Sequence, residues 1–150
     1  MADLADRTQE FHRLHETGCF VIPNPWDAGS ARALAQLGFP ALATTSAGFA
    51  WSTGRRDDDT GFDDTLVHIR AIAASVDVPV NADFQDCFAA DPVGVRDHVL
   101  AASATGVAGL SIEDSTRDRD APPLFEFDQA VDRVRAAREG IELSGNRILL

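Results

Sequence analysis

Short apolar runs alternate with longer amphipathic stretches along nearly the whole chain. The runs occupy residues 19–24, 41–46, 78–83 and 108–114, and residues 148–150 open a further one. Because each run is apolar at successive positions, it predicts a strand buried on both faces, as in a parallel sheet. The stretches between the runs are long enough for the helices that connect parallel strands. The sequence therefore predicts repeated βα units in a single domain over residues 1–150.

The stretches between the runs carry helical patterns. Gly38 is the expected stop of the first helix, and Asp91 and Pro92 are the expected N-cap and first residue of the third. In the last helix, Val131 and Val134 are expected to face inward. The segment after Ser46 is expected to be a polar, glycine-containing loop. The predicted helices cover residues 27–37, 63 onward, 91–105 and 127–138.

Polar residues end each predicted strand, and this pattern separates two architectures. An open doubly wound sheet needs a phosphate-binding turn after its first strand, but PNPWDAGSA contains neither GxGxxG nor GxxxxGK. A (β/α)8 TIM barrel places its active site at the carboxyl ends of its strands. A complete barrel takes roughly 250 residues. The barrel is therefore favoured, with this chain carrying about its first four βα units and the start of strand five.

Two carboxylates at neighbouring strand ends are the main candidates for chemistry. Asp83 ends the third run and Glu113 lies near the end of the fourth, so both are candidates to bind one ion. Hard oxygen ligands of this kind suit Mg²⁺. Ser46, with the backbone of Ala47 and Gly48, is the candidate for binding a substrate carboxylate. The alternative is that these carboxylates only cap helices or pair with nearby arginines.

Charge and composition exclude several classes of function. A net charge of −11 disfavours nucleic acid as a partner, because phosphate binding needs a surplus of basic residues. No apolar run reaches the roughly 20 residues that span a bilayer, and the first residues lack the basic-then-apolar order of a signal peptide. A cytoplasmic protein without a membrane partner is therefore expected. The sequence has no lysine, which excludes Schiff-base chemistry through that residue.

The cysteines and histidines are expected to have structural roles. Cys19 opens an apolar run and is expected to be a small buried residue, whereas Cys87 follows a strand end and is the candidate for a reactive thiol. The two form no CxxC pair. The four histidines show no metal-ligand spacing, and surface or hydrogen-bonded side chains are expected.

At the strand ends the sequence resembles the phosphoenolpyruvate mutase/isocitrate lyase superfamily, in particular its phosphonomutase-like and carboxyphosphonoenolpyruvate mutase-like group. The resemblance covers nearly the whole chain, from about Phe11 to Leu150. It implies a (β/α)8 barrel, a homo-oligomer, and a Mg²⁺ that organises a pyruvate-like enolate. The motifs that carry it, in chain order, are PNPWDAGSARAL, TTSAGFAWSTGRRD, VNADFQD and GLSIEDS.

The resemblance also implies roles for individual residues. Asp57 matches the acidic residue of a mobile gating loop, and Arg119 falls near the position of a loop lysine. Asn81 and Asp83 match a pair of aspartates, so Asn81 stands where an aspartate that binds the metal directly is usual. The implied sites are catalytic Asp57, Asp83 and Glu113, substrate-binding Ser46, Ala47, Gly48 and Arg119, and metal-binding Asn81, Asp83 and Glu113.

The expected function is a Mg²⁺-dependent lyase or mutase that cleaves or forms a C–C or P–C bond on a small 2-oxo acid or phosphonate. The KKCGH loop of the isocitrate and methylisocitrate lyases is absent after Asp83, and with it the thiol that those enzymes use as an acid. The later strands of the family lie beyond Leu150, so the chain alone is expected to lack a complete site. The alternatives are a truncated, non-catalytic half-barrel and a small-anion-binding protein.

Overall fold

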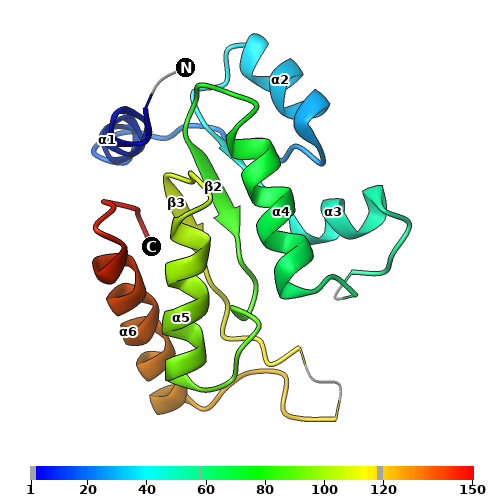
Figure 1. Cartoon of the computed structure of the whole chain (residues 1–150), viewed down its shortest axis with the longest axis vertical. Helices are drawn as coiled ribbons and strands as arrows, with labels where there is room; N and C mark the ends of the chain where they lie inside the picture. The colour runs from blue at the N-terminus through cyan, green and yellow to red at the C-terminus, as the bar shows by residue number, and fades with distance from the viewer. Residues whose placement is uncertain (1–2, 58, 118–119) are drawn as a thin grey trace.

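The computed structural model describes residues 3–57, 59–117 and 120–150, and it is built around a small parallel sheet (Figure 1). The predicted α/β class with parallel strands is confirmed. Asn81 pairs with Ala43 on one side and with Gly109 on the other, so the carboxyl ends of the strands lie at the same end of the sheet. The strands, in their order across the sheet, are β1 (Leu42–Ala43), β2 (Val80–Asp83) and β3 (Gly109–Ser111).

The predicted helices all form, and their ends follow the capping residues. Asp27 and Ser30 make a reciprocal capping box at the start of the first of them, and Gly38 follows its end with φ +90°. The Asp91 side chain accepts the Gly94 N–H at 3.0 Å. The four helices are α2 (Ala28–Gln36), α4 (Phe62–Ala73), α5 (Pro92–Ser103) and α6 (Phe127–Ser144).

Two predictions about secondary structure are wrong. Residues 19–24 form no regular strand, although they run beside β1, where the Ala43 N–H donates to Pro23 O at 3.1 Å. Pro23 has no N–H to return, so this segment cannot continue a ladder. The segment after Thr45, expected as a loop, is the short helix α3 (Ser46–Ser52), which the Thr45 side chain caps.

The face of the sheet with Val80 and Ala82 packs against helices. These residues are buried with Ile69 of α4 and Val99 of α5 in the main apolar cluster. Asn81 and Asp83 alternate with them and are half-buried on the other face. One face of the sheet is therefore apolar and covered, while polar side chains line the other.

A further helix, α1 (Leu4–Leu14), covers the amino end of the polar face. Its Phe11 is buried with Ala41 and Ala108. A Cβ added at Gly109 would lie 2.5 Å from the Phe11 ring, so the ring rests directly on β3. Leu149 packs on the same cluster and pairs with Gly109 in a parallel bridge, so the predicted fifth strand is present as a single bridge.

The inner face of α6 differs from the prediction. Val134 is 49% exposed and Val131 half-buried, so these valines are not the residues that anchor the helix. Small residues allow a close approach to α5, since a Cβ at Gly140 would lie 2.5 Å from Arg96 O. The buried residues of α6 are Arg133, Ala136, Ala137, Gly140 and Ile141.

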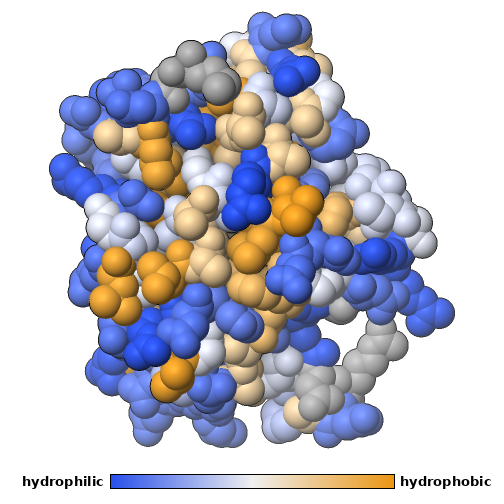
Figure 2. Space-filling view, in the orientation of Figure 1, coloured by the Kyte–Doolittle hydropathy of each residue, from blue (hydrophilic) through white to orange (hydrophobic). Residues whose placement is uncertain are grey.

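The surface keeps some large apolar side chains. Val67 of α4 and Val93 of α5 are 64% and 58% exposed. Figure 2 shows hydrophobic atoms in patches across the middle of one face, with hydrophilic residues around its edge. Within the described ranges, no helix has the length and apolar character needed to cross a membrane.

Candidate functional site

Asp83 connects the end of β2 to the start of α3. Its Oδ2 accepts the Ser46 N–H at 2.9 Å, and its Oδ1 accepts the Gln85 N–H at 3.3 Å. The Asp83 N–H in turn donates to Thr44 Oγ1 at 3.0 Å. Two residues that the sequence singled out independently, Ser46 and Asp83, are thus in direct contact.

Gly48 has a steric role in the first turn of α3. A Cβ at this position would lie 2.5 Å from Trp26 Cδ1 and 2.6 Å from Thr45 Cγ2, so no larger residue fits without displacing them. The Gly48 N–H donates to Thr45 Oγ1 at 3.3 Å. Trp26 packs edge-on against Trp51 at a centroid distance of 5.8 Å and remains 45% exposed. The substrate-binding segment predicted from the sequence therefore lies between Trp26 and the end of β2.

Glu113 and Asn81 lie near Asp83, the first beside the loop that follows it and the second within the sheet. The Glu113 N–H donates to Gln85 O at 2.7 Å, which places Glu113 beside the loop after Asp83, with its side chain exposed. Asn81 lies two residue pairs before Asp83 in the sheet, and its Nδ2 donates to Ser111 Oγ at 3.2 Å. The structure therefore brings Ser46, Asp83 and Glu113 to one end of the sheet, with Asn81 below them.

The loop after Asp83 contains an unusual run of backbone conformations. Gln85, Cys87 and Phe88 have φ of 50°, 60° and 56°, values that side-chain-bearing residues rarely adopt. Gln85 is 2% exposed, and its Oε1 has no hydrogen-bond partner among the described residues. Sequence reasoning missed Gln85. Its nearness to Asp83 was the available signal, but strand alternation could not place its side chain, because β2 ends at Asp83 and Gln85 has a positive φ.

Of the two residues predicted to lie in loops near the site, only Asp57 is among the described residues. Asp57 is exposed in the segment between α3 and α4. Arg119 falls outside the described residues. In the loop after β3, Arg117 Nη1 lies 3.3 Å from Asp86 Oδ1, and both side chains are largely buried. This ion pair joins the loop after β2 to the loop after β3.

The oxygen atoms at this end of the sheet are of the kind that magnesium prefers. Among the described residues, no cluster of three or more His, Cys, Asp or Glu side chains is arranged to hold a metal. Mg²⁺ commonly uses one or two carboxylates and keeps several waters, so carboxylates such as those of Asp83 and Glu113 are of a suitable kind. Each Asp83 oxygen accepts one N–H and retains further acceptor capacity. The unpaired Gln85 Oε1 adds a hard neutral oxygen at the same strand end.

The cysteines do not supply a nucleophile to this site. Burial raises the pKa of the Cys87 thiol to about 12, so Cys87 is a neutral, packed side chain at neutral pH. Cys19 is exposed, which contradicts the expectation that it is buried. Among the histidines, His12 Nε2 and His98 Nδ1 each contact a backbone carbonyl oxygen at 2.8 and 2.7 Å, as expected. His68 differs, because its Nε2 is buried with no partner among the described residues.

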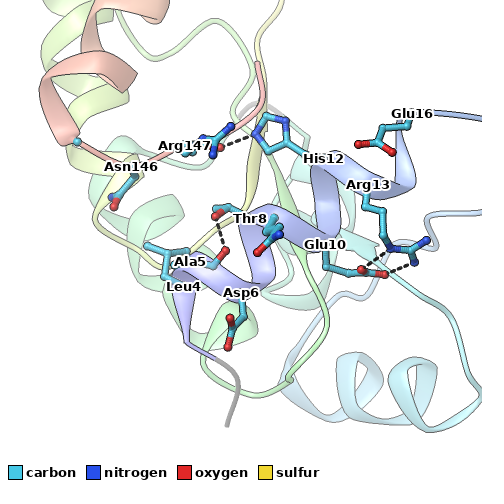
Figure 3. A pocket seen from close by; sticks show the side chains of 12 residues that line it. Leu4, Ala5, Asp6, Thr8, Glu10, His12, Arg13, Glu16, Asn146 and Arg147 are labelled. Atoms are coloured by element: carbon cyan, nitrogen blue, oxygen red, sulfur yellow. Dashed lines mark hydrogen bonds and ion pairs between the residues drawn. The ribbon is translucent and has the colours of Figure 1, made fainter.

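Two cavities of about 760 Å³ each lie in the described part of the chain. One separates α1 from residues 145–147 (Figure 3), and there His12 Nε2 contacts Arg147 O at 2.8 Å. It lies beside the amino end of β3, away from Asp83. The other borders the candidate site and lies between residues 112–115, which include Glu113, and the exposed face of α6.

Comparison with known proteins gives the family. The family model described as phosphoenolpyruvate phosphomutase matches residues 11–150. A protein of Burkholderia cenocepacia J2315 that is provisionally assigned as a lyase/mutase is 42% identical, with a TM-score of 0.89 over 93% of this chain and 50% of its own. A 2,3-dimethylmalate lyase of the phosphoenolpyruvate mutase/isocitrate lyase superfamily is 29% identical, with a TM-score of 0.85 over 99% of this chain and 52% of its own.

Two further comparisons concern a ligand bound by a relative and the length of the relatives. An oxaloacetate acetylhydrolase, solved with its product oxalate, is 26% identical, with a TM-score of 0.87 over 99% of this chain and 53% of its own. Two uncharacterized proteins of Mycobacterium tuberculosis are 35% identical over 77% of this chain and 44% of their own length. The chain thus spans about half the length of its relatives. It belongs to the phosphoenolpyruvate phosphomutase family, within the phosphoenolpyruvate mutase/isocitrate lyase superfamily.

Proposed function

We propose that this chain provides one side of an enolate-binding site in a Mg²⁺-dependent lyase or mutase. The reaction would cleave or form a C–C or P–C bond of a small 2-oxo acid or phosphonate. The observation that carries the proposal is the contact between Asp83 Oδ2 and the Ser46 N–H at 2.9 Å, which holds the metal candidate against the carboxylate-binding candidate. Family membership and the oxalate bound by a relative support the same class of ligand.

The charges at this end of the sheet require a cation for such a ligand. Asp83 and Glu113 are both acidic, and a 2-oxo acid anion placed beside them would be repelled. A bound Mg²⁺ would supply the Lewis acid that stabilises negative charge on the enolate oxygen. Asn81, Asp83 and Glu113 are proposed to hold this ion. Fixed carboxylates at neighbouring strand ends suit this role, because they need little rearrangement when charge develops.

Ser46, Ala47 and Gly48 are proposed to bind the substrate carboxylate. The Gly48 N–H already donates to Thr45, so Gly48 contributes mainly by leaving room for the Trp26 indole. The Ser46 hydroxyl and the Ala47 N–H are then the groups that would meet the carboxylate. Asp57 and Arg119 remain the proposed loop residues that close over the substrate.

The chain is proposed to form half of a (β/α)8 barrel, with the polar face of its sheet as part of the barrel interior. The arrangement of the two faces supports this, since helices cover Val80 and Ala82 while Asn81 and Asp83 line the other side. A homo-oligomer and a cytoplasmic location remain part of the proposal.

A thermal melt with oxalate, with and without Mg²⁺, tests the proposed site. Oxalate is a planar mimic of the pyruvate enolate. At 100 times its dissociation constant a ligand stabilises the folded chain by about 2.7 kcal/mol, which corresponds to a rise of about 5–10 °C. We expect this rise only when oxalate and Mg²⁺ are both present.

Two variants make the test specific. Asp83→Asn keeps the size of the side chain but removes the charge, and it should abolish the rise. Asp132→Asn changes an exposed carboxylate on α6 that pairs with Arg135, and it should keep the full rise. A rise that survives Asp83→Asn would refute the assignment. A cooperative melt of the wild-type chain that ignores both ligands would support a non-catalytic half-barrel instead.

A further inference from the structure

The loop after β2 is held by donors that surround its backbone carbonyls. Gln85 O accepts the Glu113 N–H at 2.7 Å, and Cys87 O is contacted by His98 Nδ1, also at 2.7 Å. Further donors come from α6, where Gln129 Nε2 donates to Ala90 O at 3.4 Å and one other residue makes most of the contacts. Arg133 Nη2 donates to Asp86 O at 2.6 Å, and Nη1 donates to Ala90 O at 3.2 Å and also to Ala89 O.

Arg133 is an unusual residue for this position. It is 1% exposed, and its guanidinium lies 3.9 Å from the centroid of the Phe125 ring. A buried cation is unfavourable unless its donors are satisfied. Here the donors meet backbone carbonyls that belong to one loop. An apolar side chain would fill the same space without a desolvation penalty. We therefore infer that the charged group is there to stabilise the conformation of that loop.

The loop conformation matters because it positions the two acidic side chains. The Gln85 N–H donates to Asp83 Oδ1 at 3.3 Å, and Gln85 O accepts the Glu113 N–H. The backbone of Gln85 thus contacts both, and Gln85 is the first residue of the loop with a positive φ. Such a backbone conformation persists only where surrounding contacts enforce it.

We propose that Arg133 is a positioning residue of the candidate site: by holding the carbonyls of Asp86, Ala89 and Ala90, it fixes the loop that orients Asp83 and Glu113. In this role it acts through the loop backbone. A test by ligand affinity also rests on the proposed function. A test that observes the loop backbone directly depends on the loop geometry alone.

Arg7 offers a matched control. It is half-buried, whereas Arg133 is fully buried, and its Nη1 likewise donates to a backbone carbonyl, Ala73 O, at 2.8 Å. Ala73 ends α4, away from the loop after β2. Arg7→Met and Arg133→Met therefore both remove a cation that binds backbone carbonyls, but only the second removes contacts to the loop.

The first measurement is the affinity of the full chain for oxalate in the presence of Mg²⁺, by titration calorimetry. Arg133→Met should weaken binding roughly 10- to 100-fold, as is typical when a residue that orients metal ligands is lost. Arg133→Lys keeps the charge but not the forked geometry, so it should recover only part of the affinity. Arg7→Met should change the affinity by less than about twofold, even if it lowers stability.

The second measurement is hydrogen exchange of the Ser46, Gln85 and Glu113 amides by NMR, which needs no ligand. Arg133→Met should accelerate exchange at these amides relative to the rest of the sheet, and Arg7→Met should not. Equal affinity and equal protection in both variants would overturn the proposal and make Arg133 a residue of general stability.

Two outcomes separate this inference from the proposed function. If the wild-type chain binds no oxalate with Mg²⁺, the proposed function fails, and the exchange data alone decide the role of Arg133. If Arg133→Met does not fold, Arg133→Lys decides it. If Arg133→Lys then shows wild-type affinity and wild-type protection, the forked guanidinium of Arg133 is not needed to hold the loop, and the proposal is refuted.

Discussion

His68 leads to a prediction about the pH dependence of stability. It lies on α4 and stacks on Phe49 of α3, with 4.0 Å between the ring centroids and 16° between the planes. Burial lowers the pKa of His68 from 6.5 to about 4, against a smaller opposing effect of the Asp27 carboxylate. Among the described residues its Nε2 finds no hydrogen-bond partner. The folded chain therefore binds a proton at His68 only as the pH falls to about 4.

The sign and size of the effect follow from linkage. Between pH 6.5 and about 4 the unfolded chain carries a proton on His68 that the folded chain does not, so stability is lost as the pH falls. At 1.36 kcal/mol per pH unit the full shift would be worth about 3 kcal/mol. Because the side chain is partly exposed, solvent screening reduces this to about 1–2 kcal/mol.

Urea unfolding at pH 7.5 and pH 4.5 measures this contribution when wild type is compared with His68→Phe. Phenylalanine keeps the stack on Phe49 and removes both the titration and the unpaired nitrogen. Hydrogen bonds lower the pKa values of Asp27 and Asp91 as well, so acid should weaken both proteins, and only the difference is diagnostic. We expect wild type to lose about 1–2 kcal/mol more than the variant. Equal losses would refute the reasoning.

Further predictions concern the packing and the thiols. Gly140→Ala should destabilise the chain by about 1–2 kcal/mol in urea unfolding, because the added Cβ would lie 2.5 Å from Arg96 O and overpacking outweighs the gain in helix propensity. A stability equal to wild type would show that α5 and α6 can separate freely. Cys19 should react quickly with a thiol reagent in the native chain, whereas the buried Cys87 should react only after unfolding. Two equally fast thiols would contradict the packing of the loop after β2.

The sequence predicted the elements that carry local signals. Asp27 and Asp91 mark helix starts because their side chains satisfy free backbone N–H groups, and Gly38 marks a stop because it tolerates positive φ. The polar strand ends predicted that Ser46 and Asp83 share one end of the sheet. Since parallel strands align their carboxyl ends, this conclusion needed no knowledge of distant contacts.

Features that depend on distant contacts were missed. The helix after Thr45 is too short to show a periodic pattern, and residues 19–24 look like a strand although Pro23 prevents regular pairing. On α6 the hydrophobic pattern suggested Val131 and Val134, but a charged residue occupies the buried position. Arg133 is stable there only because the loop after β2 presents its carbonyls. Nothing near Arg133 in the sequence indicates that this loop packs against it.

The order of the sheet bears on how the chain assembles during synthesis. Each strand pairs with the one before it in the sequence, and Leu149 then joins β3, so every pairing is available as soon as its own segment emerges. The first helix is the exception. Phe11 packs with Ala41, Ala108 and Leu149, all of which are synthesised after it. Leu149 follows Phe11 by 138 residues. Its docking is therefore a late event, and protection of α1 from proteolysis would report that the sheet behind it has formed.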